Sequence, residues 1–216
     1  EIAFGALVAA DGPASSVAQS LGLAALECAV ARQLRAPVAQ NPPRSPEVFF
    51  ASDYPGGYGW LFPKGDTALL GIGVARPAAR RLAALVAALH GRLVETGRVG
   101  ARVLQRSGGL IPVGGPRARL VHGAVAFAGD AAGLAHPVTG AGIHAAVLSG
   151  EWAGEAAARL AAGEAHALAA YAEEIATVFG PFLARGRAER ARLAQGDAPF
   201  TARAASGFLG GHDARF

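Results

Sequence analysis

The stretch that decides the fold is VHGAVAFAGDAAGLAHPVTGAGI, which occupies residues 121–143. Its first part, Val121 to Ala128, is an apolar run of the length that a buried strand needs. A loop punctuated by glycines follows, and apolar residues spaced for one helix face then run from Ile143 towards Leu160. A strand that leads through a turn into a helix is typical of α/β folds.

A second unit of the same kind opens the chain. Ile2 to Ala10 predicts a buried strand, Asp11-Gly12-Pro13 predicts a turn, and a helix is expected to begin near Leu21. We expect both units to share one sheet. A buried parallel strand needs neighbours on both sides, and nothing precedes this one, so it is an unusual way for a fold to begin.

The residues between the two units predict an antiparallel meander with one helix, because short apolar runs alternate there with Gly/Pro turns. The predicted strands are Glu27–Arg35, Glu47–Ser52, Tyr58–Phe62, Thr67–Ala75 and Val103–Val113, and the predicted helix is Pro77–Thr96. Two further helices, Ala165–Phe179 and Pro181–Leu193, are expected after the second unit.

Composition excludes several classes of protein. Of the 216 residues, 52% are hydrophobic and 17% charged, which is typical of a globular chain. No uncharged apolar run reaches about 18 residues, so no transmembrane helix is predicted. The single cysteine, Cys28, excludes a disulfide framework, and no metal site is predicted. The net charge of +4 is spread along the chain, so no nucleic-acid partner is expected.

The glycine-punctuated loop carries the clearest chemical signal. The predicted strand delivers Asp130 to the carboxyl edge of the sheet, where α/β proteins bind ligands, and its carboxylate could accept hydrogen bonds from ribose or ribityl hydroxyls. Gly140 and Gly142 allow a ligand to approach the backbone closely. The following helix presents the positive end of its dipole, which suits a phosphate or the electron-rich edge of a flavin.

An aromatic segment, YGWLFPK, occupies residues 58–64. The two-residue period of a strand places Tyr58, Trp60 and Phe62 on one face, with Gly59 leaving the opposite face open. Two interpretations stand: a flat wall that lines a pocket for an apolar ligand or stacks near a flavin, or core packing against the next strand. Lys64, the only lysine among twenty basic residues, either anchors an anionic headgroup or is simply a turn residue.

At these residues the sequence resembles a known family. Asp11-Gly12 after a strand resembles the DG motif of flavoproteins of the aromatic-hydroxylase group, and Gly129-Asp130-Ala131-Ala132 resembles their GD motif. Within that group the chain is similar to the geranylgeranyl reductases. The stretches that carry this likeness are Pro55 to Gly65, Gly108 to Pro112 with Gly114 to Pro116, and Gly129 to Gly133 with Pro137 to Gly140 and Gly142-Ile143.

The resemblance implies FAD as cofactor and an isoprenoid lipid as substrate. The cofactor-binding residues that it implies are Asp11, Gly12, Gly129, Asp130, Ala131, Pro137, Gly140, Ala141, Gly142 and Ile143. The substrate-lining residues that it implies are Tyr58, Trp60, Phe62, Pro63 and Lys64. It implies no metal, and it names no catalytic proton donor.

The family frame also predicts the domain organisation. Residues 1–26 and 114–160 are expected to be the C-terminal portion of a Rossmann-like FAD domain, 27–113 an inserted antiparallel-sheet substrate domain, and 161–216 a helical C-terminal region. The glycine-rich fingerprint of such a domain is missing, and the chain contains no Met, which predicts an N-terminally incomplete flavoprotein. Ala141 stands where the family usually has Glu.

The resulting hypothesis is an FAD-dependent reductase of carbon–carbon double bonds in a geranylgeranyl or polyprenyl lipid. The electron donor of such an enzyme would be NADPH or a ferredoxin-like carrier. The enzyme would be located in the cytoplasm, either free or in peripheral contact with the membrane that holds its lipid. The alternatives are a flavin-dependent monooxygenase or halogenase, against which Gly133 and Ile143 speak, and a truncated fragment without catalysis.

Two weaker features remain open. His136 and His144 flank the loop and are read either as surface or capping residues or as neighbours of the flavin. Four arginines form a basic run on a predicted helix, read as a solvated face or as a membrane contact. They are Arg185, Arg187, Arg190 and Arg192.

Overall fold

The computed structural model describes residues 3–194. The chain forms two compact units. The first consists of the residues up to Cys28 together with Leu110–Arg190, and the second is built on Ala29–Gly109. The sequence placed the corresponding boundaries after residues 26 and 113, and the roles that it gave to the four segments stay predictions. Residues 195–216, the end of the predicted helical C-terminal region, lie outside the described part.

The first unit is a small sheet covered by helices. Its strands lie in the order β1 (Leu7–Ala9), β8 (Val125–Phe127), β7 (Val121–His122). β1 is parallel to β8, with Val8 opposite Ala126, whereas β7 is antiparallel to β8. The two predicted strand–turn–helix units therefore do share one sheet.

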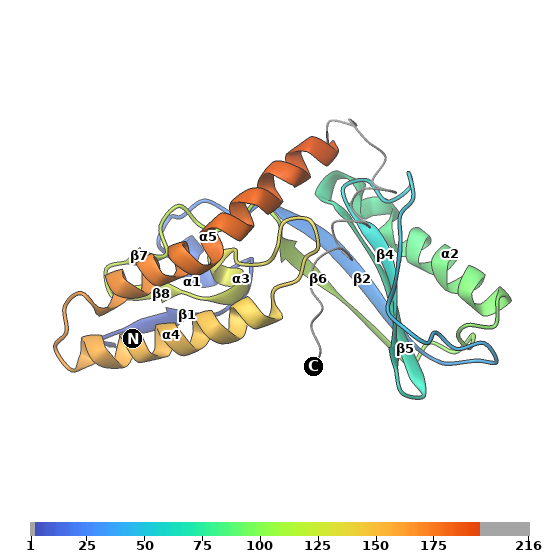
Figure 1. Ribbon diagram of the computed structural model, residues 1–216, viewed down its shortest axis with the longest axis horizontal. Helices are drawn as coiled ribbons and strands as arrows, with labels where there is room; N and C mark the ends of the chain where they lie inside the picture. The colour runs from blue at the N-terminus through green and yellow to red at the C-terminus, as the bar shows by residue number, and fades with distance from the viewer. Residues whose placement is uncertain (1–2, 195–216) are drawn as a thin grey trace. The chain divides into compact units, whose positions relative to one another are not determined.

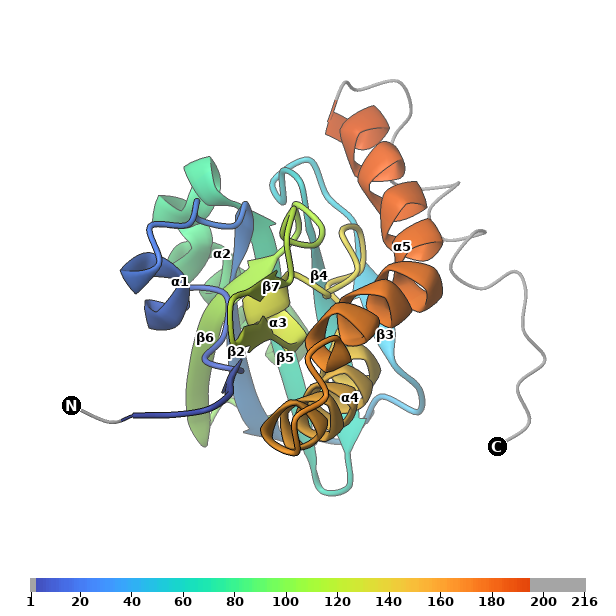
Figure 2. The ribbon, with the colours of Figure 1, turned by 90° about the vertical axis from the view of Figure 1, so that its left-hand side faces the viewer.

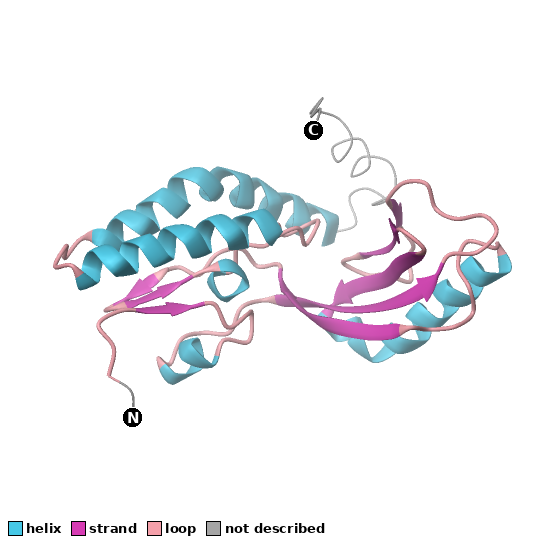
Figure 3. Ribbon diagram, turned by 90° about the horizontal axis from the view of Figure 1, so that it is seen from below, coloured by secondary structure: helices cyan, strands magenta, loops and turns pink. Residues whose placement is uncertain are grey.

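Five helices are present among the described residues, besides a 3₁₀ segment. In the first unit α1 (Ser16–Ser20) lies on one side of the sheet, and α4 (Ile143–Ala161) and α5 (Ala167–Ala194) run side by side on the other (Figures 2 and 3). The short α3 (Gly129–Ala132) directly follows β8. The core includes Phe127 and Leu134, with Tyr171, Ile175 and Leu183 contributed by α5.

Four details of the first unit differ from expectation. The helix expected to begin near Leu21 is α1, which ends at Ser20 with Leu21 as its C-cap. Val121 to Ala128 is not one strand, because Gly123 at φ +59° turns the chain between β7 and β8. β1 is shorter than the predicted Ile2–Ala10. The helices predicted on either side of Pro181 are one helix, α5. Proline costs a helix one hydrogen bond, to the carbonyl of Thr177 here, but Phe179 and Leu183 on the two sides of the break are both buried in the core.

The second unit is a five-stranded sheet in the order β3 (Glu47–Phe49), β4 (Tyr58–Lys64), β5 (Thr67–Ala75), β2 (Cys28–Pro37), β6 (Gln105–Pro112). The meander of β3, β4 and β5 is antiparallel, as predicted. After the 3₁₀ segment Arg76–Arg81, helix α2 (Leu82–Glu95) packs on one face of the sheet (Figure 1). Leu82, Val86 and Leu89 of this helix share a core with Leu61, Leu70 and Ile72 of the strands.

Helix α5 is the one helix within residues 3–194 that is long and apolar enough to cross a membrane, with a mean hydropathy of 1.2 in its most apolar window. The sequence criterion, which required an uncharged run, excluded such a segment. The buried face of α5 belongs to the core of the first unit. Packing within the protein buries 33% of that window.

Candidate functional site

The segment Gly129–Gly142, here called the glycine loop, is closed by hydrogen bonds of its own. The backbone N–H of His136 donates to the Ala141 carbonyl and that of Gly140 donates to the His136 carbonyl, both at 2.8 Å. The Thr139 N–H donates to Nδ1 of His136 at 3.2 Å, and the Ala141 N–H donates to the Thr139 hydroxyl at 3.1 Å. Its conformation is therefore set locally rather than left to a ligand.

Asp130 is the most distinctive group of this loop. It stands in the first turn of α3 and is half-buried. Burial raises the pKa of its carboxyl. Within residues 3–194 no donor bonds to this carboxylate. A Cβ at Gly142 would lie 3.4 Å from its Oδ1 and 3.3 Å from Ala135. The missing side chain at Gly142 thus keeps backbone and carboxylate close together at the start of α4.

Glycines and one serine fix the entry to the loop. Gly129 adopts φ +55°, and its N–H donates to the hydroxyl of buried Ser149 on α4 at 2.9 Å. Gly133 adopts φ +82°, where a Cβ would lie 2.4 Å from the Gly115 carbonyl oxygen. The sequence did not single out Ser149. A small polar residue nearly two turns inside a helix has no pattern that distinguishes it from a surface serine.

Asp11 and Gly12, the predicted DG motif, lie between β1 and α1. Oδ2 of Asp11 accepts hydrogen bonds from the Ser16 hydroxyl and the Val17 N–H, both at 3.1 Å. Burial raises the pKa of Asp11, but hydrogen bonds from the first turn of α1 outweigh it and lower the pKa below its ordinary value. Gly12 adopts φ +82°. The carboxylate therefore organises its own helix, and its contact with a cofactor stays a prediction.

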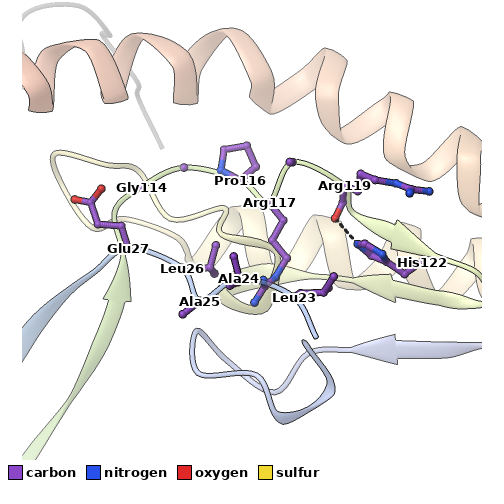
Figure 4. Close-up of a pocket in the computed structure, with 12 residues that line it drawn as sticks. Leu23, Ala24, Ala25, Leu26, Glu27, Gly114, Pro116, Arg117, Arg119 and His122 are labelled. Atoms are coloured by element: carbon purple, nitrogen blue, oxygen red, sulfur yellow. Dashed lines mark hydrogen bonds between the residues drawn. The ribbon is translucent and has the colours of Figure 1, made fainter. Parts of the chain in front are cut away.

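Arg117, which the sequence did not single out, connects the two motif regions. Its Nε donates to the Ala131 carbonyl at 2.7 Å, its Nη1 donates to the Ala24 carbonyl at 2.9 Å, and its guanidinium lies 5.0 Å from the centre of the Phe127 ring. It crosses a cavity of about 370 Å³ whose walls include Leu23 to Glu27 and Gly114 to Arg119 (Figure 4).

The second half of α5 packs against the glycine loop. The Phe182 ring lies 4.5 Å from that of His136, and a Cβ at Gly186 would lie 2.8 Å from His136 Nε2. Nη1 of Arg190 donates to the Pro137 carbonyl at 3.2 Å, and its Nε lies 3.6 Å from Oε1 of Glu27. Arg190 thus departs from the solvated-face interpretation, whereas Arg187 is exposed, although its stem lies close to Gly115.

His136 and His144 occupy different surroundings. Burial lowers the pKa of His136, whose Nδ1 accepts the Thr139 N–H, so that the ring is neutral and caps the loop from inside. His144 lies on the exposed side of α4, with its ring 5.7 Å from that of Phe179. His136 therefore bonds within the loop, and the helix-capping interpretation does not describe it, because neither α3 nor α4 has a side-chain cap.

The aromatic row lies in the second unit, on the sheet face opposite α2. The centre of the Trp60 ring is 6.1 Å from that of Tyr58 and 6.3 Å from that of Phe62. All three side chains are half-buried and lie outside the core cluster, whereas Leu61 between them is fully buried. The aromatic row therefore lies outside the core cluster, although the Trp60 ring does pack against the next strand at Gly71, and its role as a substrate wall stays a prediction.

Two further expectations for this segment can be compared with the structure. The face opposite the rings is not open at Gly59, because a Cβ there would lie 3.2 Å from the Tyr54 ring. Pro63 is half-buried opposite Ala68, and Lys64 is exposed at the strand end, with its carbonyl accepting the Thr67 hydroxyl. The headgroup role of Lys64 stays a prediction. Within the described residues no cluster of metal-ligating side chains occurs.

No protein-family model matches the chain. The digeranylgeranylglycerophospholipid reductase of Methanocaldococcus jannaschii is 33% identical over 159 residues, which are 71% of this chain and 41% of that protein. A geranylgeranyl bacteriochlorophyll reductase-like protein from Thermoplasma acidophilum superposes with a TM-score of 0.77 at 25% identity, covering 88% of this chain and 50% of that one.

The chain belongs to the geranylgeranyl reductase family. It spans about two-fifths of the length of the curated relative. The Pseudomonas aeruginosa protein PqsL, a probable FAD-dependent monooxygenase, also superposes, with a TM-score of 0.62 at 25% identity, and covers 88% of this chain and 56% of that one. The predicted family resemblance is confirmed. So is the α/β fold class with an antiparallel-sheet part and a C-terminal helix.

Proposed function

We propose that this geranylgeranyl reductase homologue is part of an FAD-dependent oxidoreductase that reduces carbon–carbon double bonds of a geranylgeranyl or polyprenyl lipid. The observation that carries the proposal is the Asp130 carboxylate, half-buried, without a donor from residues 3–194, and held beside Gly142 at the start of α4. A carboxylate placed in this way is available to a ligand that supplies hydroxyl or N–H donors.

The residues of the glycine loop fit an FAD. Asp130 would accept hydrogen bonds from ribityl or ribose hydroxyls, and Gly140 to Ile143 would offer backbone without intervening side chains. Helix α4 begins at Gly142 without a side-chain cap, so its positive dipole end is directed at this place. The chemistry that FAD supplies when bound is hydride transfer to one alkene carbon, while a proton reaches the other.

The substrate would lie on the aromatic row of the second unit. Tyr58, Trp60 and Phe62 present half-buried rings on a fully paired sheet, which suits an isoprenoid chain better than a polar ligand. Lys64 at the end of the same strand would meet an anionic headgroup. In this proposal NADPH or a ferredoxin-like carrier reduces the flavin, and the enzyme is cytoplasmic with peripheral contact to the membrane that holds its lipid.

A flavin monooxygenase is the second candidate, favoured by the likeness to PqsL. The higher TM-score of the geranylgeranyl reductase-like protein, at the same identity, favours the reductase. The two candidates differ in their use of oxygen. A reductase saturates prenyl double bonds under anaerobic conditions, whereas a monooxygenase consumes reduced nicotinamide cofactor only in the presence of oxygen.

The test uses this chain and a chimera in which it replaces the matching stretch of the Methanocaldococcus jannaschii relative. We expect a flavin absorbance spectrum from the chimera and, under anaerobic reduction, the gain of hydrogen by a geranylgeranyl lipid in mass spectrometry. Asp130→Asn should weaken FAD binding about tenfold, because a hydrogen bond to a charged acceptor is replaced by a weaker one.

Asp66→Asn is the matched control, since Asp66 is exposed in the turn between β4 and β5 of the other unit. It should leave FAD binding unchanged. A chimera that binds no flavin, or an Asp130→Asn variant that binds it as the parent does, would overturn the cofactor assignment and leave the non-catalytic fragment as the better description.

A further inference from the structure

The Trp60 side chain does not stand up from its strand but lies across the neighbouring one. In the register of the sheet, Trp60 on β4 is opposite Gly71 on β5, and Gly71 is opposite Gln33 on β2. The indole Nε1–H donates to Oε1 of Gln33 at 3.1 Å. The ring therefore spans a whole strand to reach its acceptor.

Gly71 makes this arrangement possible. A Cβ at Gly71 would lie 2.3 Å from Cζ2 and 2.6 Å from Cε2 of the Trp60 ring, and 2.5 Å from the backbone carbonyl oxygen of Arg32, so both the ring and the neighbouring strand require glycine here. A Cβ at Gly73, the next residue on the same face, would lie 3.8 Å from Cζ3. The indole thus lies directly over Gly71 and Gly73 of β5, and a side chain at Gly71 would displace it from the sheet.

Gln33 holds the ring in this position. An indole N–H is only a donor, so the amide oxygen of Gln33 must point towards it. Nε2 of Gln33 then points the other way, with the Ser107 hydroxyl of β6 at 3.5 Å. Because the Trp60 side chain is half-buried, loss of the acceptor would leave its N–H without a partner on the protein side.

We propose that Gln33 is a positioning residue that fixes the Trp60 indole as the flat floor of the polyprenyl site, and that Gly71 is the residue whose small size admits this orientation. The proposal rests on the proposed function for the identity of the ligand. The Phe62 ring, inclined by only 24° to the indole, extends the floor along the strand, and the Tyr58 ring stands more steeply at 67°.

The first measurement concerns the ring and needs no ligand. The chain has two tryptophans, so Trp152→Phe leaves Trp60 as the sole reporter. In that background Gln33→Leu should change the near-ultraviolet circular dichroism of Trp60 and raise its quenching by acrylamide. Gln33→Glu, which keeps an oxygen acceptor, should retain the parent signals. Gln105→Leu is the matched control, an identical change at an exposed position of β6 in the same sheet.

The second measurement concerns the ligand. Geranylgeraniol is titrated into each variant and followed by Trp60 emission. Gln33→Leu should weaken binding about fivefold, as expected for one neutral hydrogen bond, and Gln33→Glu and Gln105→Leu should stay close to the parent. Gly71→Ala should alter both signals, because it displaces the ring directly, and far-ultraviolet circular dichroism checks that its sheet is retained.

The outcomes separate the two proposals. If Gln33→Leu leaves the ring signals and the geranylgeraniol affinity equal to those of Gln105→Leu, the positioning role is wrong. If the ring signals change but the affinity does not, Gln33 holds the indole without serving the ligand, and the proposal is likewise overturned. If the parent protein itself binds no geranylgeraniol, the substrate assignment fails, while the ring signals still decide whether Gln33 holds Trp60.

Discussion

The glycine loop and the aromatic row of Tyr58, Trp60 and Phe62 are built in opposite ways. The glycine loop takes its shape from the backbone: glycines at positive φ, and N–H groups that close on carbonyls and hydroxyls of the same segment. The aromatic row takes its shape from side chains on a regular sheet, where Gly71 leaves space under Trp60. Tolerance to substitution should follow backbone conformation in the first region and side-chain size in the second.

The two regions also differ in what they leave unpaired. In the loop the half-buried carboxylate of Asp130 has no donor among residues 3–194. On the sheet, the rings of the aromatic row lie outside the core cluster and keep part of their apolar surface exposed. The glycine loop thus suits a polar ligand with hydroxyl donors, and the aromatic row suits an apolar chain. This is the pairing of a flavin cofactor with a prenyl substrate that we propose.

The largest effect on stability is expected at Gly133. Gly133→Ala would place a Cβ 2.4 Å from the Gly115 carbonyl oxygen, which is backbone and cannot rotate away, at a φ of +82° that strains any other residue. We expect the free energy of unfolding to fall by about 3 kcal/mol, measured by urea denaturation.

Gly123→Ala is the matched control. Gly123 has a positive φ of +59°, but a Cβ there would have no atom within 4 Å, so only the backbone strain of about 1 kcal/mol should appear. Equal losses for the two variants would mean that the contact between the loop and Gly115 does not shape the loop, and the contrast between the two regions would lose its basis.

Much of the sheet could be predicted from sequence because local signals agreed there. The strand Thr67–Ala75 was predicted with the same ends that the structure shows, because Lys64-Gly65-Asp66 marks the turn before it and the apolar run stops at Arg76. Gly123 was missed because a single glycine inside an apolar run also occurs in continuous strands. Pro181 was taken as a helix end, but burial of Phe179 and Leu183 outweighs the lost hydrogen bond.

The candidate site was predictable only in its motif residues. Gly129 to Ala132 and the start of α4 follow from glycine spacing after a strand, which is a local pattern. Arg117 and Gln33 were missed because their partners lie far along the chain: Ala24 for the first and Trp60 for the second. No spacing rule identifies a side chain whose role is set by the tertiary fold.

A smaller effect is expected at Arg190, which holds the loop from α5. Arg190→Met keeps much of the aliphatic stem but removes the donor to the Pro137 carbonyl and the charge beside Glu27. We expect a loss of about 1 kcal/mol and faster amide hydrogen exchange at Gly140 and Ala141. Arg185→Met on the exposed side of α5 should change neither. Equal exchange in both variants would show that the loop holds itself without α5.

The smallest expected effect is a dependence of the unfolding free energy on pH, which should arise in the glycine loop and not at the aromatic row. Burial lowers the pKa of His136 below its ordinary value of 6.5, so the unfolded chain binds a proton more readily than the folded one. Stability should therefore fall as the pH drops through about 6.5 and level off below the lower, folded pKa. Protonation also removes the Nδ1 lone pair that accepts the Thr139 N–H. In the aromatic row, burial raises the pKa of Tyr58, so that ring stays neutral over this range.

The variant that isolates this effect is His136→Asn, whose amide oxygen can accept the Thr139 N–H but cannot be protonated at these pH values. The difference in unfolding free energy between pH 7.5 and 5.5 should be smaller in the variant than in the parent, because the other titrating groups are common to both. A nuclear magnetic resonance titration of His136 should give a pKa below 6.5. An equal pH difference in both proteins would mean that protonation of His136 does not open the loop.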